Sequence, residues 1–189
     1  MYRITLFGYA QATRSNAEIT AFHEAFPGHH LQLALAAERS AAHPITRLIG
    51  NSGFAEGWGR HAEHSRKSWV FYSSHYALVN RRLWPARGMV VDPGIHVFGW
   101  TREQAVKFVD ASGRFEGDVA KAIIDRLVVW PGQLTAYDTG ALEFFALRKR
   151  AQDTLQERFD LREFTPLCSG TALSRYRCCA NRSNIGLRV

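Results

Sequence analysis

Three histidines and one glutamate lie within a single eight-residue string, His23-Glu24-Ala25-Phe26-Pro27-Gly28-His29-His30. A His-Glu pair followed one helical turn later by another His presents two metal ligands and a general base to one zinc ion. Here Pro27-Gly28 lengthens that spacing, and an unbroken helix would separate His23 from His29 by about 9 Å along its axis. The string therefore predicts a zinc site only if the helix breaks between its two halves.

A break at Pro27 is expected because proline lacks an amide hydrogen and its ring collides with the preceding turn. The segment after the break can then move back and bring one histidine to the usual ligand position beside His23. We favour His29 as this second ligand and keep His30 as the alternative, which could instead support the site from behind. Glu24, next to the first ligand, would then act as the general base.

The third ligand should come from a neighbouring helix, because a catalytic zinc ion takes three protein ligands and leaves one position open for water. Glu56 follows a glycine-containing loop and begins a segment that could pack against the first helix. Glu63, two turns later on the same face, could orient a ligand or bind a substrate amine. The sequence thus predicts a Zn²⁺ ion held by His23, His29 and Glu56.

Two further segments carry side chains suited to stabilising an oxyanion. His96 lies in a Gly- and Pro-rich stretch, residues 92–100, which we interpret as a loop ahead of a capped helix. Tyr137 follows the sequence Trp-Pro-Gly-Gln by one turn and offers a phenol donor. A His and a Tyr aimed at a developing oxyanion would complete a zinc hydrolase.

Helices must position these side chains. Capping boxes at residues 15–18 and 101–104 predict two helix starts, and apolar residues recur near the helical period in the last long segment. Strand candidates are confined to residues 4–8 and 89–91. The predicted helices run from residue 15 through 23 with a break near 27, then over 31–39, 54–67, 69–84 (ending before Pro85), 101–113, 119–129 and 134–159. The predicted fold class is therefore all-α.

The net charge of +7 is concentrated in the last part of the chain. Residues 165–189 hold four arginines and no acid, which leaves 20 basic and 17 acidic groups in the remainder. That remainder shows no basic stripe interleaved with aromatics, so we expect no nucleic-acid partner. A nucleic-acid-binding module rests on net charge alone and would bind with a strong salt dependence through the tail arginines. The three cysteines also lie in this tail, at positions 168, 178 and 179, with a spacing that fits neither a disulfide framework nor a zinc site.

Four ordered blocks give the chain a family resemblance. They read HEAFPGHHLQ, FAEGW, VVDPGIHVFGWTREQA and WPGQLTAYDTGALEFFALR. These blocks resemble the bacterial family called domain of unknown function 885, which looks like a distant member of the gluzincin-type zinc metallopeptidases. The resemblance covers roughly residues 15–164 and implies a largely helical cleft. It places His23, a histidine of the 29–30 pair and Glu56 around the metal, Glu24 as base, and His96 and Tyr137 along the site.

The chain departs from the family pattern at both ends. Family members extend several hundred residues further on the N-terminal side, so residues 1–164 look like the C-terminal portion of the metallopeptidase-like domain. The missing N-terminal segment would form the opposite wall of the cleft, and without it the half-cleft would expose apolar surface.

The tail, residues 165–189, is compositionally foreign, and we expect it to be disordered. After Phe164 the family typically continues with a pattern like H-x-x-V-L-G-x-G-x-x-P-L-x-V-L, whereas this chain reads TPLCSGTALSRYRCCANRSN. A codon string for HTVVLGHGAVPLSVLREPIE, read one base later, spells that tail. We interpret the tail as the product of a frameshift after Phe164.

No apolar run approaches the roughly 18 residues that span a bilayer, and the N-terminus carries no recognisable signal peptide. We therefore expect no membrane partner and a cytoplasmic location by default, although full-length relatives could be exported. The predicted function is zinc-dependent hydrolysis, with a peptide or small-molecule substrate and water deprotonated by Glu24. The alternative is a truncated, non-catalytic remnant that binds metal without turnover.

Overall fold

The computed structural model describes residues 13–38, 51–64, 75–113 and 115–169. Within these ranges every regular element is helical and none is a strand, which confirms the predicted all-α class. A short 3₁₀ turn, η4 (Gln156–Arg158), precedes the last helix. The α-helices are α1 (Arg14–Glu24), α2 (His29–Glu38), α3 (Ser52–Glu63), α4 (His75–His96), α5 (Arg102–Asp110), α6 (Asp118–Val129), α7 (Gln133–Leu155) and α8 (Leu161–Ser169).

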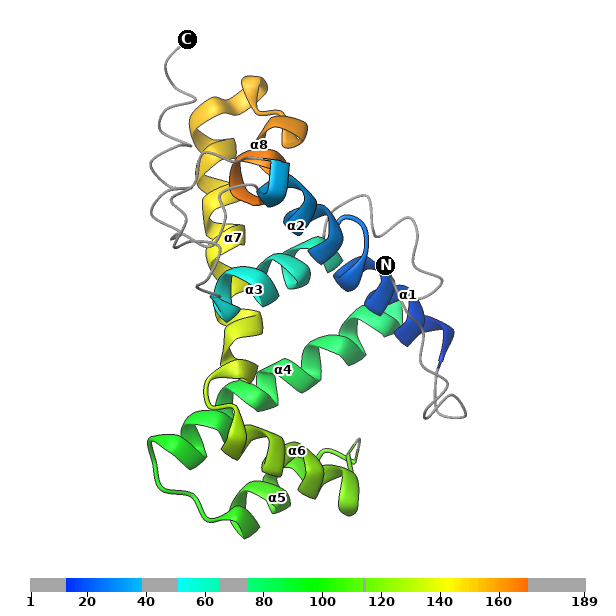
Figure 1. The fold of residues 1–189 in the computed structure, drawn as a ribbon, viewed down its shortest axis with the longest axis vertical. Helices are drawn as coiled ribbons and strands as arrows, with labels where there is room; N and C mark the ends of the chain where they lie inside the picture. Colours follow the sequence, from blue (N-terminus) through cyan, green and yellow to red (C-terminus); the bar gives the residue numbers. More distant parts are fainter. Residues whose placement is uncertain (1–12, 39–50, 65–74, 114, 170–189) are drawn as a thin grey trace.

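Helix α7 joins two groups of helices: in Figure 1, α8 lies toward one end of the molecule and α5 and α6 lie at the other, with α4 between them. In the first group α3 packs along α7, while α1 and α2 contact α3 and α8 contacts α2. In the other group α4 contacts α7, α5 contacts α4, and α6 contacts α5; α4 also contacts α1 of the first group. The core of the first group consists of Phe54, Trp58, Phe144, Leu147, Ala151, Phe164 and Cys168. The core of the second consists of Val91, Ala105, Val109, Ala120, Ile124, Leu127 and Leu134.

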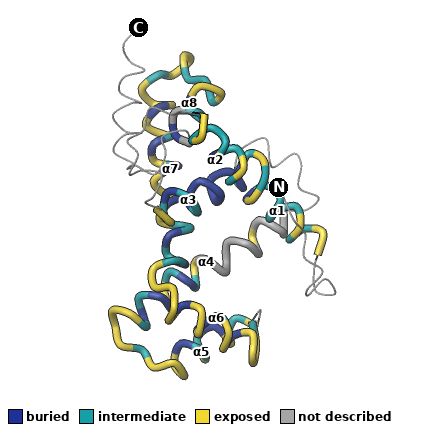
Figure 2. Tube along the Cα trace, in the orientation of Figure 1, coloured by how far each residue is buried: buried dark blue, intermediate teal, exposed yellow. Residues whose placement is uncertain are grey.

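Helix α3 is buried from Gly57 through Glu63, as the dark-blue tube in Figure 2 shows. It approaches α7 very closely, because a Cβ atom added at Gly57 would lie 2.5 Å from the Cα of Gly140. Two glycines facing each other therefore set the separation of these two helices. This contact brings the side chains of α3 and of the first turns of α7 to one place.

Helix starts follow the sequence signals in part. Thr101 caps α5 with the predicted capping box, in which its side chain accepts from the amide of Gln104 and the Gln104 side chain accepts from the Thr101 amide. The predicted cap at Ser15 is wrong, since α1 begins at Arg14 and its cap is Thr13, whose hydroxyl accepts from the amide of Asn16. The shift of two residues leaves the face of the helix that carries His23 unchanged.

The largest correction concerns α4, which was predicted to end before Pro85 and to be followed by a strand over 89–91 and a loop over 92–100. Instead α4 continues through Pro85 and Pro93 to His96, and only residues 97–101 form the connection to α5. A proline removes one backbone hydrogen bond, whereas the turns beyond it are held by burial. Val91 is fully buried, and Gly88 allows Leu134 of α7 to approach. Tertiary packing therefore outweighs the local break.

The remaining predictions hold to within a few residues. Helices α2, α3, α6 and α7 overlap the predicted ranges, and α7 ends four residues before the predicted limit of 159. Helix α8 runs to Ser169 and so continues past the predicted boundary at 164, with Cys168 buried in the core. The strand candidate over 4–8, positions 65–74 and residues 170–189, with Cys178 and Cys179, lie outside the described residues.

Candidate metal centre

His23 lies at the end of α1 and is almost completely buried, with 2% of its surface exposed. Its Nδ1 atom lies 2.8 Å from Oε1 of Glu63, and its Nε2 atom lies 3.2 Å from Oε2 of Glu56. Gly59 of α3 makes room for the ring, since an added Cβ would lie 2.6 Å from Cε1 of His23. The imidazole is therefore fixed in one orientation between two carboxylates of the same neighbouring helix.

The turn after α1 returns the chain toward His23, as the sequence predicted for the Pro27-Gly28 break. The Phe26–Pro27 peptide bond is cis, and a Cβ atom at Gly28 would overlap the carbonyl of His23, so only glycine fits there. The indole Nε1 of Trp58 donates to the carbonyl oxygens of Pro27 at 3.0 Å and of Gly28 at 3.3 Å. These contacts fix the turn against α3, and α2 begins directly after it.

His29 opens α2 and faces the same carboxylate as His23. Its Nε2 atom lies 3.6 Å from Oε2 of Glu56, and its ring meets that of His23 edge-on with centroids 4.7 Å apart. Gln32, one turn later, lies 3.5 Å from the Nδ1 of His29 and donates to the carbonyl of Phe54. The structure thus brings His29 to the cluster, while His30, the predicted alternative, is exposed.

Glu56 lies on the second turn of α3, whose start is capped by Asn51. Burial alone raises the pKa of its carboxyl group, but hydrogen bonds and charge from His23 and His29 lower it to about 2. The other carboxylate oxygen, Oε1, accepts a hydrogen bond from Nε2 of Gln133 at 3.3 Å. Glu56 is therefore held as a carboxylate with one oxygen directed at the two imidazoles.

Glu24, the predicted base, follows His23 and is exposed. One of its carboxylate oxygens, a ring nitrogen of His23 and a ring nitrogen of His29 all lie within 4.8 Å of one another. Two imidazoles and carboxylates are the donors that zinc prefers. The donor set at this point of the described structure thus fits a zinc ion.

A chain of charged groups supports His23 from behind. Glu63, fully buried, accepts from Nη1 of Arg60 at 2.6 Å through the oxygen that does not face His23. Arg60 Nε in turn donates to Oδ1 of Asp138 on α7 at 2.9 Å. Glu63 was predicted either to orient a ligand or to bind a substrate amine, and its contact with Nδ1 of His23 suits the first role. Arg60 and Asp138 were not predicted. These two residues are 78 positions apart, and no local pattern in the sequence pairs them.

Tyr137 of α7 also reaches the cluster. Its ring stacks on that of His23 with centroids 5.9 Å apart, and its hydroxyl accepts from Gln133 at 3.1 Å. Burial, followed by the charge of Glu56, raises the pKa of this phenol. Tyr137 therefore keeps its proton at neutral pH and remains a hydrogen-bond donor. Gln133, which contacts both Tyr137 and Glu56, was not predicted and carried no signal beyond its place in the Trp-Pro-Gly-Gln sequence.

His96 occupies a different environment at the end of α4. Its Nε2 atom lies 3.1 Å from the carbonyl oxygen of Leu127 and 3.7 Å from Oδ1 of Asp92. The same Asp92 oxygen accepts from the amide of Gly132 at 3.1 Å. His96 thus joins the end of α4 to α6, while Asp92 joins α4 to the α6–α7 connection. The predicted role of His96 toward an oxyanion stays a prediction.

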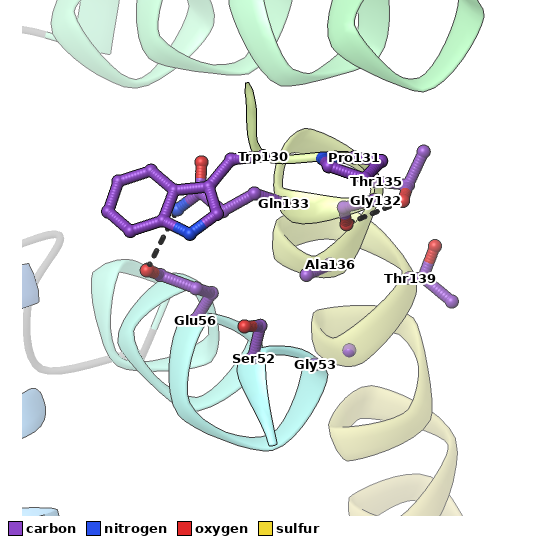
Figure 3. Close-up of a pocket in the computed structure, with 11 residues that line it drawn as sticks. Ser52, Gly53, Glu56, Trp130, Pro131, Gly132, Gln133, Thr135, Ala136 and Thr139 are labelled. Carbon is purple, nitrogen blue, oxygen red and sulfur yellow. Dashed lines mark hydrogen bonds between the residues drawn. The ribbon is translucent and has the colours of Figure 1, made fainter. Parts of the chain in front are cut away.

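A cavity of about 530 Å³ opens beside Glu56 (Figure 3). Ser52, Gly53 and Glu56 line it from α3. The other lining residues come from the α6–α7 connection and from the first turns of α7, including Trp130, Gln133 and Thr139. The cluster of histidines and glutamates and this cavity therefore share one side chain, Glu56.

The described helices define an all-α protein with a histidine–glutamate cluster at the meeting point of α1, α2 and α3. The sequence matches the family described as "Bacterial protein of unknown function (DUF885)" over residues 1–166. This chain belongs to that family.

Two solved structures resemble the chain. A "putative lipoprotein" from Colwellia psychrerythraea is 27% identical with a TM-score of 0.82, over 92% of this chain and 30% of that one. A "putative lipoprotein of unknown function" from Shewanella oneidensis is 22% identical with a TM-score of 0.74, over 100% of this chain and 35% of that one, and shows the shared fold. The chain thus spans about a third of the length of each. No curated protein matches it.

Among the helices that the structure describes, none combines the length and the apolar character needed to cross a bilayer.

Proposed function

We propose that this chain carries the metal centre of a zinc-dependent hydrolase that acts on peptide bonds. His23, His29 and Glu56 would hold the metal, and Glu24 would be the general base. The observation that carries the proposal is the spacing of the donor atoms. Two ligand atoms at about 2.0–2.2 Å from a tetrahedral zinc ion lie about 3.3 Å apart. Oε2 of Glu56 lies 3.2 Å from Nε2 of His23 and 3.6 Å from Nε2 of His29.

Zinc at this position would supply a Lewis acid that polarises a carbonyl group and makes water a nucleophile at neutral pH. The residues of the chain would do the remaining work. Glu24, exposed beside the buried His23, accepts the proton of the attacking water, as a carboxylate base requires. Glu63 accepts from Nδ1 of His23 and so keeps Nε2 turned toward the ligand position.

Tyr137 is the better placed of the two predicted oxyanion donors. It stacks on His23 and shares Gln133 with Glu56, whereas His96 contacts Leu127 and Asp92. A protonated phenol near the reacting carbonyl would stabilise negative charge on its oxygen. This set of roles, with a glutamate as third ligand, is what the gluzincin-type resemblance implies.

The test is the zinc content of the purified chain, measured by mass spectrometry beside His23→Ala and Glu56→Ala. We expect about one zinc ion per chain in the wild type and loss of it in both variants. Glu24→Gln should keep the metal but abolish cleavage of a fluorogenic peptide library, because it removes the base and leaves the ligands. A soluble helical wild-type chain without zinc would refute the metal centre.

The second candidate is a non-catalytic remnant that binds metal without turnover. The chain spans 30% and 35% of the two solved structures, so an activity of a full-length relative does not by itself extend to this chain. One zinc ion per chain with no cleavage of any library member would support it. Zinc-dependent cleavage that Glu24→Gln abolishes would exclude it.

The names of the two solved structures bear on location. Both are called putative lipoproteins, and a shared fold at 27% identity with one of them favours an exported, membrane-anchored full-length form over the cytoplasmic default. Fractionation of cells that express the full-length gene, with detection of this chain, tests it. We expect the protein in the membrane fraction. Its recovery in the cytosolic fraction would instead support the cytoplasmic location that was expected from the sequence.

We also propose that the reading frame changes after Phe164. The family match ends at residue 166, two positions later, and a single-base displacement of a family-like codon string accounts for residues 165–184. The arginines and cysteines beyond this point would then be accidents of frame. Genomic sequence that contains no displaced family-like frame downstream of Phe164 would contradict this hypothesis.

A further inference from the structure

The cavity between α3 and α7 gives this centre a substrate class. We propose that it holds the substrate side chain next to the scissile bond, and that it takes a neutral side chain, aromatic or aliphatic. The assignment to the scissile bond rests on the proposed function, whereas the preference for neutral groups rests on the cavity alone.

Glu56 connects the cavity to the histidine cluster. Its Oε2 atom faces His23 and His29, its Oε1 atom accepts from Gln133, and the same side chain lines the cavity. A group that fills the cavity therefore lies one side chain away from the imidazoles. The volume of about 530 Å³ falls in the range of roughly 300–1,000 Å³ that is usual for small-ligand pockets.

The lining of the cavity lacks a free charge. Glu56 is the one charged side chain among the described residues that line it, and its carboxylate is already engaged by His23, His29 and Gln133. The hydroxyl of Thr135 is also engaged, since it donates to the carbonyl of Gly132 at 2.8 Å. A lysine or glutamate side chain that entered would lose hydration without gaining an opposite charge.

Trp130 supplies an aromatic surface to the same cavity. This residue is 61% exposed, although a tryptophan of this size gains by being covered. It is followed by Pro131 and by Gly132, whose φ of 79° few other residues adopt. The amide of Gly132 donates to Asp92, so the turn that carries the indole is fixed to α4. The guanidinium carbon of Arg126 lies 5.7 Å from the centre of this ring, and the indole is still largely exposed. A fixed, exposed indole beside a cavity whose one charged lining side chain is already engaged favours a neutral, preferably aromatic, partner.

The first test measures binding without chemistry. The probes are the N-acetyl amides of phenylalanine, leucine, lysine and glutamate, titrated by NMR into the full chain with and without zinc. We expect the phenylalanine and leucine probes to bind at least about tenfold more tightly than the charged probes, with phenylalanine ahead. Trp130→Ala should lower the affinity for the phenylalanine probe about tenfold, because the probe would lose a full aromatic contact. Phe98→Ala, at an aromatic that is 73% exposed on another connection, is the matched control and should leave binding unchanged.

The second test reverses the charge preference. Thr139 lines the cavity and is exposed, so that a longer side chain is tolerated there. Thr139→Lys should improve binding of the glutamate probe, and Thr139→Asp should improve binding of the lysine probe, each relative to the other probes. Equal binding of all four probes to the wild type, or an unchanged phenylalanine affinity in Trp130→Ala, would overturn the inference.

Cleavage assays then separate this inference from the proposed function. Selective probe binding in a chain that cleaves no peptide would uphold the cavity and refute the hydrolase. Zinc-dependent cleavage that shows no preference among phenylalanine, leucine, lysine and glutamate next to the scissile bond, and that Trp130→Ala does not change, would have the opposite meaning. It would uphold the hydrolase and refute the role of the cavity in substrate selection.

Discussion

The two groups of helices in this molecule bury different kinds of side chains. The group formed by α4, α5 and α6 with the start of α7 has an apolar core and, among the described residues, buries one charged side chain, Asp92, while charges such as Arg102 and Asp125 are exposed. The group formed by α1, α2 and α3 with the rest of α7 buries His23, Gln32, Arg60, His61 and Glu63.

Burying a charge costs free energy unless it is paired. In the α1–α3 group the cost is met by a continuous chain from His23 through Glu63 and Arg60 to Asp138. Such an arrangement adds little to stability compared with apolar packing, but it fixes one imidazole in one orientation. The comparison indicates that the α1–α3 group uses several buried charged and polar side chains to fix one imidazole, whereas the α4–α6 group packs mainly through apolar side chains.

The largest effect that would test this difference is expected from Glu63→Ala. Removal of this carboxylate leaves Arg60 and His23 buried without their partner, so the free energy of unfolding should fall by about 3–5 kcal/mol. Asp125→Ala is the matched control in the other group, since its pair with Arg102 has about half of each side chain exposed. That variant should change the free energy of unfolding very little, because water screens this exposed ion pair. Urea denaturation of both variants measures the contrast, and similar losses would contradict it.

Alanine substitutions at one glycine in each group distinguish an effect on the geometry of the histidine cluster from an effect on stability alone. In Gly59→Ala the added Cβ would meet the ring of His23, so zinc affinity should fall about 10- to 100-fold. In Gly88→Ala the Cβ would meet the flexible Leu134 side chain at 2.8 Å, which affects packing in the other group. We expect Gly88→Ala to bind zinc like the wild type. Chelator competition measures zinc affinity, and thermal unfolding measures stability. Equal zinc affinity in all three proteins would sink the idea that Gly59 positions His23.

The features that could be predicted from the sequence are those that neighbouring residues determine. The string around Pro27-Gly28 predicted both the helix break and the position of His29 near His23, because proline and glycine act on the conformation of their own turn. The capping box at Thr101 likewise depends on four consecutive residues. The features that could not be predicted depend on contacts between segments that are distant in the sequence. The passage of α4 through Pro85 is held by packing against α7.

The same limit applies to the site. Glu56 was predicted from its loop and helix start, but the link between Arg60 and Asp138 exists only once α3 and α7 cross at Gly57 and Gly140. His96 and Tyr137 looked equivalent as oxyanion donors in the sequence. Only the fold shows that Tyr137 stacks on His23 while His96 contacts the carbonyl of Leu127 in α6.

Acid should weaken the α1–α3 group through His61. This residue is packed among Trp58, Phe144 and Phe145, and neither ring nitrogen has a hydrogen-bond partner among the described residues. Burial, followed by the charges of Arg148 and His64, lowers its pKa from 6.5 to about 3.

Because the unfolded chain binds this proton between pH 6.5 and pH 3 and the folded chain does not, the stability is complete above pH 6.5 and is lost as the pH falls. Between pH 7 and pH 5 the loss from His61 should be about 2 kcal/mol. His61→Phe should remove that part of the pH dependence in urea denaturation, and the exposed His30→Phe should retain it. An unchanged slope in His61→Phe would show that other groups cause the acid sensitivity.

The smallest expected effects come from two helix caps, one in each group. Asn51 accepts from the amide of Phe54 at the start of α3, and Thr101 accepts from the amide of Gln104 at the start of α5. Replacement of either cap by alanine should lower the free energy of unfolding by about 1 kcal/mol. Glu56 lies five residues after Asn51 on the helix that this cap begins, so Asn51→Ala should also weaken zinc binding, whereas Thr101→Ala should not. If both variants lose the same stability and neither changes zinc affinity, the start of α3 is rigid without its cap, and Glu56 owes its position to the contacts of α3 with α7 alone.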